Sequence, residues 1–125
     1  MPATLLIVDD SKSSRKVNLA FARELLGDTV NCLEAAGGAE ALEILATQRV
    51  DVALLDLTMP GINGFDVLAE MRRQNMSAKI IVVSADIQKQ TKERVAAMGA
   101  VGFIDKPIKL DALRALLTKL GMIHD

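Results

Sequence analysis

Short apolar runs alternate with amphipathic stretches five times along the chain. The runs lie at residues 5–8, 30–33, 52–55, 80–83 and 101–104. A short continuous run of this kind is typical of a strand that is buried on both faces of a parallel sheet. We therefore predict five strands, of which the second has the weakest pattern because the polar Asn31 interrupts it.

Each stretch that follows a run carries apolar residues at helical spacing. In the first, at residues 11–26, Val17, Phe21 and Leu25 recur every four residues and predict the buried face of a helix. The same reasoning predicts further helices after Gly37-Gly38 and over residues 64–73, 87–98 and 110–120. Three of the five are followed by a glycine at the position of a C-cap, namely Gly27, Gly99 and Gly121.

This alternation predicts an α/β fold of five βα units, with helices on both faces of a parallel sheet. Five units are too few for the closed eight-stranded barrel. The remaining architecture is an open, doubly wound sheet of the flavodoxin-like type, with right-handed crossovers and the strand order 2-1-3-4-5. Residues 1–125 show no linker or repeat, so we expect a single domain without a separate output domain.

The composition agrees with one domain and narrows its chemistry. The chain has 125 residues and a formal net charge of −1, which gives no basic footprint for nucleic acid. Three Phe and no Trp or Tyr mean that the core must be aliphatic. A single cysteine, Cys32, excludes an internal disulfide, and together with the single histidine, His124, it cannot build a Cys/His zinc site. No apolar run approaches the roughly 20 residues of a membrane span, and residues 1–4 do not resemble a signal peptide, so we expect a cytoplasmic protein.

Polar residues follow four of the predicted strands at the point where each strand ends. They are Asp9-Asp10, Asp56, Ser84 and Lys106. The carboxyl ends of parallel strands share one edge of the sheet, which is where ligands of such folds bind. We therefore expect three carboxylates, a hydroxyl and an ammonium to meet there.

This set of groups has the parts of a phosphoryl-transfer site. Close carboxylates need a cation to remain ionised, and oxygen ligands without His or Cys suit Mg²⁺ or Mn²⁺. One carboxylate could then accept a phosphoryl group, with Lys106 and Ser84 contacting its oxygens. Taken singly, each residue has a structural alternative: Asp9 or Asp10 could cap the first helix, and Ser84 with Asp86 could cap the fourth. Chance explains the complete set poorly.

At this point the chain resembles the receiver domain of two-component response regulators, closest to the single-domain CheY-like type. The residues that carry the resemblance are Asp9-Asp10, Asp56, Met59-Pro60-Gly61, Gly64, Ser84-Ala85, Phe103 and Lys106-Pro107. They span nearly the whole chain in the family's order and spacing. The chain departs from the family pattern at Ser84, where Thr is more frequent, at Phe103, where Tyr is frequent, and at Asn63, where Asp is often seen.

The resemblance implies a role for each of these residues. Asp56 would accept a phosphoryl group from a phosphohistidine on a sensor histidine kinase or a phosphotransfer protein. Asp10, Asp56 and the Thr58 carbonyl would bind Mg²⁺ directly, and Asp9 would act through water. Lys106 would pair with the phosphoryl group, the backbone of Met59 and Ala85 would contact it, and the Lys106–Pro107 bond would be cis.

The resemblance also implies a switch that changes partner binding. Ser84 would move toward the phosphoryl group, and Phe103 would turn inward as the face made by the fourth helix, fifth strand and fifth helix changes. The output partner stays open: a monomer of this kind could bind a flagellar switch, a phosphatase of the chemotaxis type or a kinase in a relay, or it could be a shuttle between histidine proteins. Thr58 and Asp86 would tune the lifetime of the phosphorylated state.

Three other functions remain as alternatives. A hydrolase with an aspartyl-phosphate intermediate would need an acid two residues after Asp56, where this chain has Thr58. A flavodoxin-like cofactor binder would place a phosphate next to Asp9-Asp10, which would repel it. A degenerate receiver that is never phosphorylated would not need the complete acidic set. The resemblance therefore favours a phosphoacceptor signalling domain, which assists only its own phosphorylation and dephosphorylation, over an enzyme.

Overall fold

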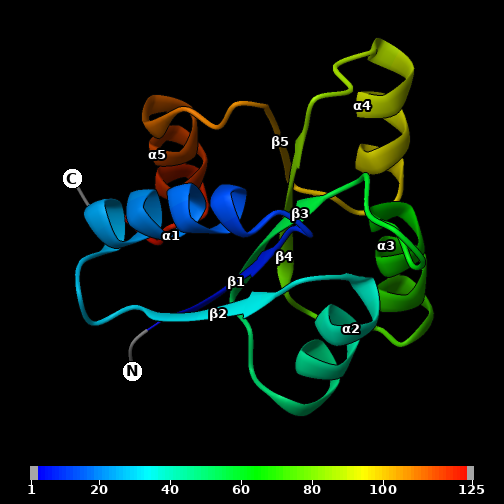
Figure 1. The fold of residues 1–125 in the computed structure, drawn as a ribbon, viewed down its shortest axis with the longest axis horizontal. Coiled ribbons are helices and arrows are strands. Elements are labelled where there is room, and N and C mark those ends of the chain that lie inside the picture. Colours follow the sequence, from blue (N-terminus) through cyan, green and yellow to red (C-terminus); the bar gives the residue numbers. More distant parts are fainter. Residues whose placement is uncertain (1–2, 124–125) are drawn as a thin grey trace.

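The computed structural model describes residues 3–123 and forms an open sheet of five parallel strands with helices on both faces (Figure 1). The strands are β1 (Thr4–Val8), β2 (Asn31–Ala35), β3 (Val52–Asp56), β4 (Lys79–Ser84) and β5 (Gly102–Asp105). The helices are α1 (Lys12–Leu26), α2 (Gly38–Thr47), α3 (Gly64–Arg73), α4 (Lys89–Ala97) and α5 (Leu110–Lys119). The strand order β2-β1-β3-β4-β5 confirms the predicted doubly wound, flavodoxin-like architecture. His124 lies outside the described residues, and none of the helices within 3–123 has the length and apolar character of a membrane span.

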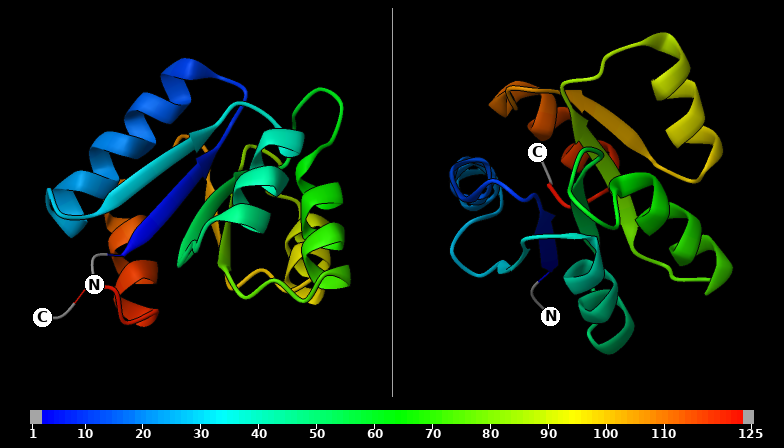
Figure 2. Two further views of the ribbon diagram at one scale, coloured as in Figure 1. Left: turned by 90° about the horizontal axis from the view of Figure 1, so that it is seen from below. Right: turned by 45° about the vertical axis from the view of Figure 1, so that its right-hand side comes forward.

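Two apolar clusters, one on each face of the sheet, hold the fold together. Alternate residues of one strand belong to different clusters, because successive side chains of a strand point to opposite faces. In β1, Leu5 and Ile7 belong to the cluster that includes residues of α1 and α5, whereas Leu6 and Val8 belong to the cluster that includes residues of α2, α3 and α4. Figure 2 shows α1 and α5 on one face of the sheet and α2 and α3 on the other. The fully buried side chains of both clusters are aliphatic or methionine, as the composition predicts.

The two edge strands are displaced from the predicted runs, whereas each of the three central strands contains its run. β2 begins one residue after the predicted start of 30–33 and extends further, and only its last residue, Ala35, is fully buried. β5 is likewise displaced by one residue from 101–104 and buries only Ile104. Each edge strand has a single neighbour in the sheet, so part of the strand faces solvent. The residues in that part need not be apolar. An unbroken apolar run therefore marks an edge strand less sharply than a central one.

The predicted apolar face of the first helix is confirmed for Phe21 and Leu25, which are half-buried and pack against the apolar cluster on the α1 side of the sheet. Val17 was wrongly included, because it is 45% exposed. The fully buried residues of α1 are Asn18 and Ala22, and at 3.6 residues per turn Val17 lies about 140° around the helix from Ala22. α4 is also shorter than predicted, since it begins two residues after Ile87, which is exposed in the preceding loop.

The segment after β3 requires glycine at two positions. Gly61, which follows Pro60, has a φ of 72°, in the left-handed region that favours glycine and that the third position of a type II turn requires. Gly64, the first residue of α3, packs so closely that an added Cβ would lie 2.5 Å from the carbonyl oxygen of Asp56 and 2.8 Å from the Cα of Leu57. The amide of Gly64 also donates a hydrogen bond of 3.1 Å to the Leu57 carbonyl. The start of α3 is therefore fixed against the end of β3.

Candidate functional site

The polar residues that were predicted to converge lie together at the carboxyl edge of the sheet. Asp9 follows β1 directly, and Asp56 is the last residue of the neighbouring β3. Ser84 ends β4, and its carbonyl oxygen accepts a hydrogen bond of 2.9 Å from the amide of Lys106, just after β5. The parallel topology is sufficient to bring these four residues to one edge.

Three aspartates form a compact acidic cluster. One carboxylate oxygen from each of Asp9, Asp10 and Asp56 lies within 4.8 Å of the other two. Asp9 and Asp56 are only 1% and 6% exposed, whereas Asp10 is exposed to solvent. Buried carboxylates lose their hydration, so such a cluster is stable only when cations or hydrogen-bond donors compensate its charge.

Lys106 supplies part of that compensation. Its Nζ lies 2.9 Å from Asp9 Oδ2 and 3.3 Å from Asp56 Oδ2, so one ammonium bridges two buried carboxylates. Two backbone amides contribute as well: that of Ser11 donates to Asp9 Oδ1 at 2.8 Å, and that of Thr58 donates to Asp56 Oδ1 at 3.3 Å. One ammonium faces more than one carboxylate, so the cluster keeps a negative charge that a further cation can neutralise.

The pKa values of Asp56 and Lys106 reflect this balance. Burial raises the pKa of Asp56 above its ordinary value; the charge of Asp9 adds to the rise, and that of Lys106 opposes it. Burial acts to lower the pKa of Lys106, but its hydrogen bond with Asp9 and the charge of Asp56 outweigh burial, so that this pKa is raised. Lys106 therefore stays charged, and Asp56 is less acidic than a free aspartate.

The donor set fits a hard divalent cation. The three side chains of the cluster that could bind a metal all offer carboxylate oxygens, and within the described residues no His or Cys joins them. Oxygen donors suit Mg²⁺ or Mn²⁺, and Mg²⁺ commonly uses one or two carboxylates and several waters. The exposure of Asp10 gives water access to the cluster. The residues therefore fit the magnesium site that the resemblance implies.

The Ser84 side chain is buried beside the cluster but makes its hydrogen bond elsewhere. Its Oγ accepts a bond of 3.0 Å from the amide of Asp86. Asp86 in turn accepts bonds from the amide of Gln88 and the hydroxyl of Thr91, and so organises the entry to α4. The N-cap of α4 is Gln88, so Ser84 and Asp86 do not cap this helix directly. A contact between Ser84 and a phosphoryl group stays a prediction.

Two more of the predicted site residues lie on the loops around the cluster. Met59 is buried and packs in the apolar cluster on the side of α3, whereas Ala85 is exposed.

The helix that follows β1 is capped by Ser11, whose Oγ accepts a bond of 3.3 Å from the Ser14 amide. Neither of the preceding aspartates caps α1, so the capping alternative for Asp9-Asp10 was wrong.

Phe103 lies on β5, half-buried against the apolar cluster on the side of α4. The Lys92 ammonium on α4 lies 5.3 Å from the ring centroid and 3.5 Å from Asp105 Oδ1. A polar contact and a cation–π contact thus join α4 to β5 over the residue that the resemblance expects to move. The bond between Lys106 and Pro107 is cis, as expected.

One residue of this region, Arg15, was missed by the sequence analysis. Its guanidinium Nη1 donates a bond of 2.7 Å to the carbonyl oxygen of Asp9, and its Nε lies 3.1 Å from Glu34 Oε1. A signal was present in the sequence, because Arg15 lies about 20° around α1 from the buried Ala22. A charged residue on the buried face of a helix needs a partner.

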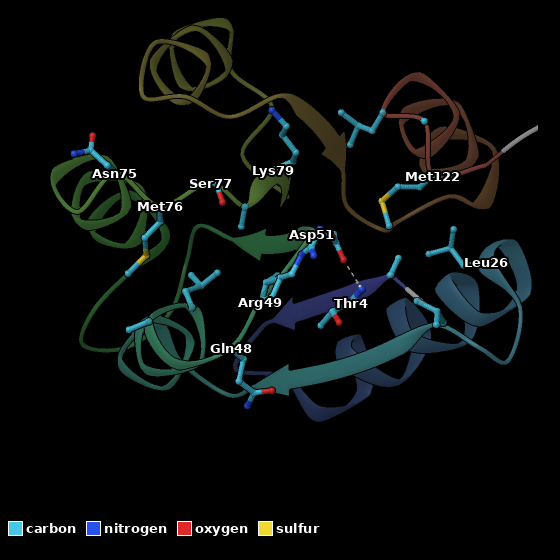
Figure 3. Close-up of a pocket in the computed structure, with 18 of the residues that line it drawn as sticks. Thr4, Leu26, Gln48, Arg49, Asp51, Asn75, Met76, Ser77, Lys79 and Met122 are labelled. Carbon is cyan, nitrogen blue, oxygen red and sulfur yellow. Dashed lines mark hydrogen bonds and ion pairs between the residues drawn. The ribbon is translucent and has the colours of Figure 1, made fainter. Parts of the chain in front are cut away.

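A second region, at the opposite edge of the sheet, contains a hollow of about 980 Å³ (Figure 3). Thr4, Asp51 and Lys79, at the amino ends of the strands, contribute to its lining. Asp51 Oδ2 accepts a bond of 2.8 Å from the Thr4 amide, and Asp51 Oδ1 lies 3.7 Å from Nε of Arg49. None of the strand-end residues of the acidic cluster lines this hollow. The two features are therefore separate.

The class of protein follows from the fold, the acidic cluster and the lysine together. A family model for the response regulator receiver domain matches residues 5–118. The chain belongs to this family, which comprises signalling domains of two-component systems.

Individual relatives agree with this assignment. The chain is 35% identical over 115 residues to the probable C4-dicarboxylate response regulator DctR of Bacillus subtilis (strain 168), covering 92% of this chain and 50% of that protein. It is 32% identical over 120 residues to the sensor protein EvgS of Escherichia coli (strain K12), covering 96% of this chain but 10% of that protein. The chain thus spans half or less of these relatives. The solved structure of the chemotaxis response regulator CheY4 of Vibrio cholerae matches with a TM-score of 0.84 and 28% identity, covering 96% of this chain and 99% of that one.

Proposed function

We propose that this chain is a phosphorylation-operated switch in which Asp56 is the phosphoacceptor. The observation that carries the proposal is a buried carboxylate, Asp56, that has a lysine ammonium at 3.3 Å and two further carboxylates within 4.8 Å. This combination gives a nucleophile, a counter-charge for the incoming phosphoryl group and ligands for a cation. The donor is the phosphohistidine of a sensor kinase or of a phosphotransfer protein.

Asp10, Asp56 and the Thr58 carbonyl are the proposed direct ligands of Mg²⁺, with Asp9 acting through water and Mn²⁺ as a substitute. When bound, the cation neutralises carboxylate charge and a phosphoryl oxygen, which allows two anions to approach each other. The burial of Asp9 and Asp56 supports this assignment, because their negative charge is only partly compensated by Lys106.

In the transfer step, a carboxylate oxygen of Asp56 forms a bond to phosphorus while the bond from phosphorus to the donor imidazole nitrogen breaks. The electron pair of the broken bond stays on that nitrogen, and the donor leaves as neutral imidazole when its second nitrogen carries a proton. Lys106 then balances the charge of the bound phosphoryl group, and the backbone amides of Met59 and Ala85 donate to its oxygens. In this structure the Ser84 Oγ accepts a hydrogen bond of 3.0 Å from the Asp86 amide. Ser84 can contribute its hydroxyl to the phosphoryl group by rotating away from that amide.

The output of the switch is a change in the face formed by α4, β5 and α5. Lys106 directly follows β5, and its amide is bonded to Ser84 at the end of β4. A movement of Ser84 and Lys106 toward Asp56 therefore reaches β5, where inward rotation of Phe103 alters the surface that a partner binds. The domain promotes only its own phosphorylation and dephosphorylation, acts as a monomer in the cytoplasm, and takes its output through a protein partner of the chemotaxis or relay type.

The test is an intact-mass measurement after incubation with acetyl phosphate and Mg²⁺. We expect one added phosphoryl group on the wild type, none on Asp56→Asn, and an unchanged result for Asp28→Asn, which removes an exposed carboxylate in the loop after α1. Label on Asp56→Asn at the wild-type level would remove Asp56 from this role.

Absence of label has two explanations that beryllofluoride separates. Binding of beryllofluoride by unlabelled wild type would indicate rapid dephosphorylation, and failure to bind it would indicate a degenerate receiver. Sustained release of phosphate over many turnovers would instead identify the hydrolase alternative.

A further inference from the structure

Arg15 occupies an unusual place for an arginine in a small domain. It lies in the first turns of α1, and its side chain is only 15% exposed. A guanidinium keeps its charge at all ordinary pH values, so its burial is unfavourable unless its donors are paired. Two partners meet that need: the Asp9 carbonyl at 2.7 Å and the Glu34 carboxylate at 3.1 Å.

These contacts connect three elements at the point where the acidic cluster begins. The Asp9 amide donates to the carbonyl of Ala35, so β1 and β2 are still paired beyond the last residue of β1. Arg15 adds a second tie, from α1 to the Asp9 carbonyl, and Glu34 on β2 holds the other side of the guanidinium. The backbone at Asp9 is therefore hydrogen-bonded through its amide to β2 and through its carbonyl to Arg15 on α1.

The contact differs from a direct charge effect on the cluster. Arg15 donates to the main chain of Asp9, whereas the Asp9 carboxylate is occupied by the Ser11 amide and by Lys106. A positive charge near a cation site weakens cation binding by repulsion, so through-space electrostatics predicts that loss of Arg15 strengthens it. A positioning contact predicts the opposite sign, because the carboxylates lose their fixed geometry.

We propose that Arg15 is a positioning residue: it fixes the backbone of Asp9 and Asp10 so that their carboxylates are preorganised for Mg²⁺, with Glu34 orienting its guanidinium. The proposal rests on the magnesium site of the proposed function. Partners that orient metal ligands from behind commonly change metal affinity by about 10- to 100-fold. We expect the lower end here, because Asp9 keeps its other hydrogen bonds.

The experiment is a calorimetric titration of Mg²⁺ into wild type, Arg15→Met, Arg15→Lys and Glu34→Gln, with thermal unfolding of each. Met retains most of the apolar stem, so the variant removes the donors with little loss of packing. We expect about tenfold weaker Mg²⁺ binding for Arg15→Met, partial rescue by Lys, and a smaller loss for Glu34→Gln. Lys16→Met, which removes an exposed charge on the same helix, is the matched control and should not weaken binding.

A cooperatively folded Arg15→Met that binds Mg²⁺ as tightly as the wild type, or more tightly, would overturn the proposal. So would a weakening of the same size in Lys16→Met. If Arg15→Met fails to fold, Arg15→Lys and Glu34→Gln decide the matter, and wild-type affinity in both would refute the positioning role. Failure of the wild type itself to bind Mg²⁺ would instead refute the proposed magnesium site.

Discussion

The two edges of the sheet are built differently, although the same five strands make both. At the carboxyl edge, Asp9, Asp56 and Ser84 are almost completely buried, and Lys106 reaches across the strand ends to both aspartates. At the amino edge lies a hollow of about 980 Å³, and the charged groups around it are largely solvated: the side chain of Arg49 there is 79% exposed.

The difference shows that open volume and buried charge need not coincide. Burying ionised groups is unfavourable, so a fold that keeps two buried carboxylates against one lysine maintains them at a cost in stability. The amino edge does not incur this cost, because Asp51 there accepts a hydrogen bond from the Thr4 amide and forms an ion pair with the exposed Arg49. We therefore base the proposed function on the edge with desolvated charge and not on the hollow at the other edge.

The largest expected difference between the edges is the loss of stability when a glycine at each edge is replaced by alanine, which adds one methyl group. Gly64→Ala places a Cβ against the backbone of Asp56 and Leu57 at 2.5 and 2.8 Å, and we expect it to lower the free energy of unfolding by about 3 kcal/mol. Gly121→Ala, beside the hollow, meets no atom within 4 Å and carries only the strain of its φ of 79°, about 1 kcal/mol. Urea denaturation of both variants measures the contrast, and equal losses would mean that the end of β3 can move to make room.

The next contrast concerns two lysines. Lys106→Met removes an ammonium that lies 2.9 Å from Asp9 and 3.3 Å from Asp56, so the carboxylates become free for another cation. We expect Mg²⁺ to bind about tenfold more tightly, a change of about 1.4 kcal/mol, while phosphorylation no longer couples to output. Lys79→Met, at the amino edge, should leave Mg²⁺ affinity unchanged in the same calorimetric titration. Weaker Mg²⁺ binding in Lys106→Met would show that the lysine does not compete for the cluster.

Most of the fold was predictable from the sequence because the central strands are buried on both faces. β3 and β4 appear as unbroken apolar runs for this reason, whereas β2 at the edge shares its run with the polar Asn31 and was misplaced. The most buried residues of α1 were missed because they are the polar Asn18 and the small Ala22, which a search for large apolar residues overlooks.

The candidate site was predictable as a set of residues but not as a set of contacts. Strand ends share an edge, so the meeting of Asp9, Asp56 and Lys106 follows from topology. Spacing could not reveal that Asp9 is buried while Asp10 is exposed, or that the Ser84 hydroxyl is held by its own loop. Arg15 was missed because its two partners, the Asp9 carbonyl and the Glu34 carboxylate on β2, leave no local pattern in the sequence, and because the buried side of α1 that it shares with Ala22 was not recognised.

The smallest expected effect tests the amino edge itself. Asp51→Ala removes an acceptor at 2.8 Å from the Thr4 amide and a long ion pair with Arg49, and we expect a loss of about 1 kcal/mol in the free energy of unfolding. Its Mg²⁺ affinity and its phosphorylation by acetyl phosphate should equal those of the wild type, because Asp51 lies at the far end of the strands from Asp56. Asp51→Asn is the matched control, since its amide oxygen can still accept from Thr4 and most of the stability should return. An Asp51→Ala variant that loses phosphorylation while remaining folded would show that the two edges are coupled, and the assignment of function to the carboxyl edge alone would fail.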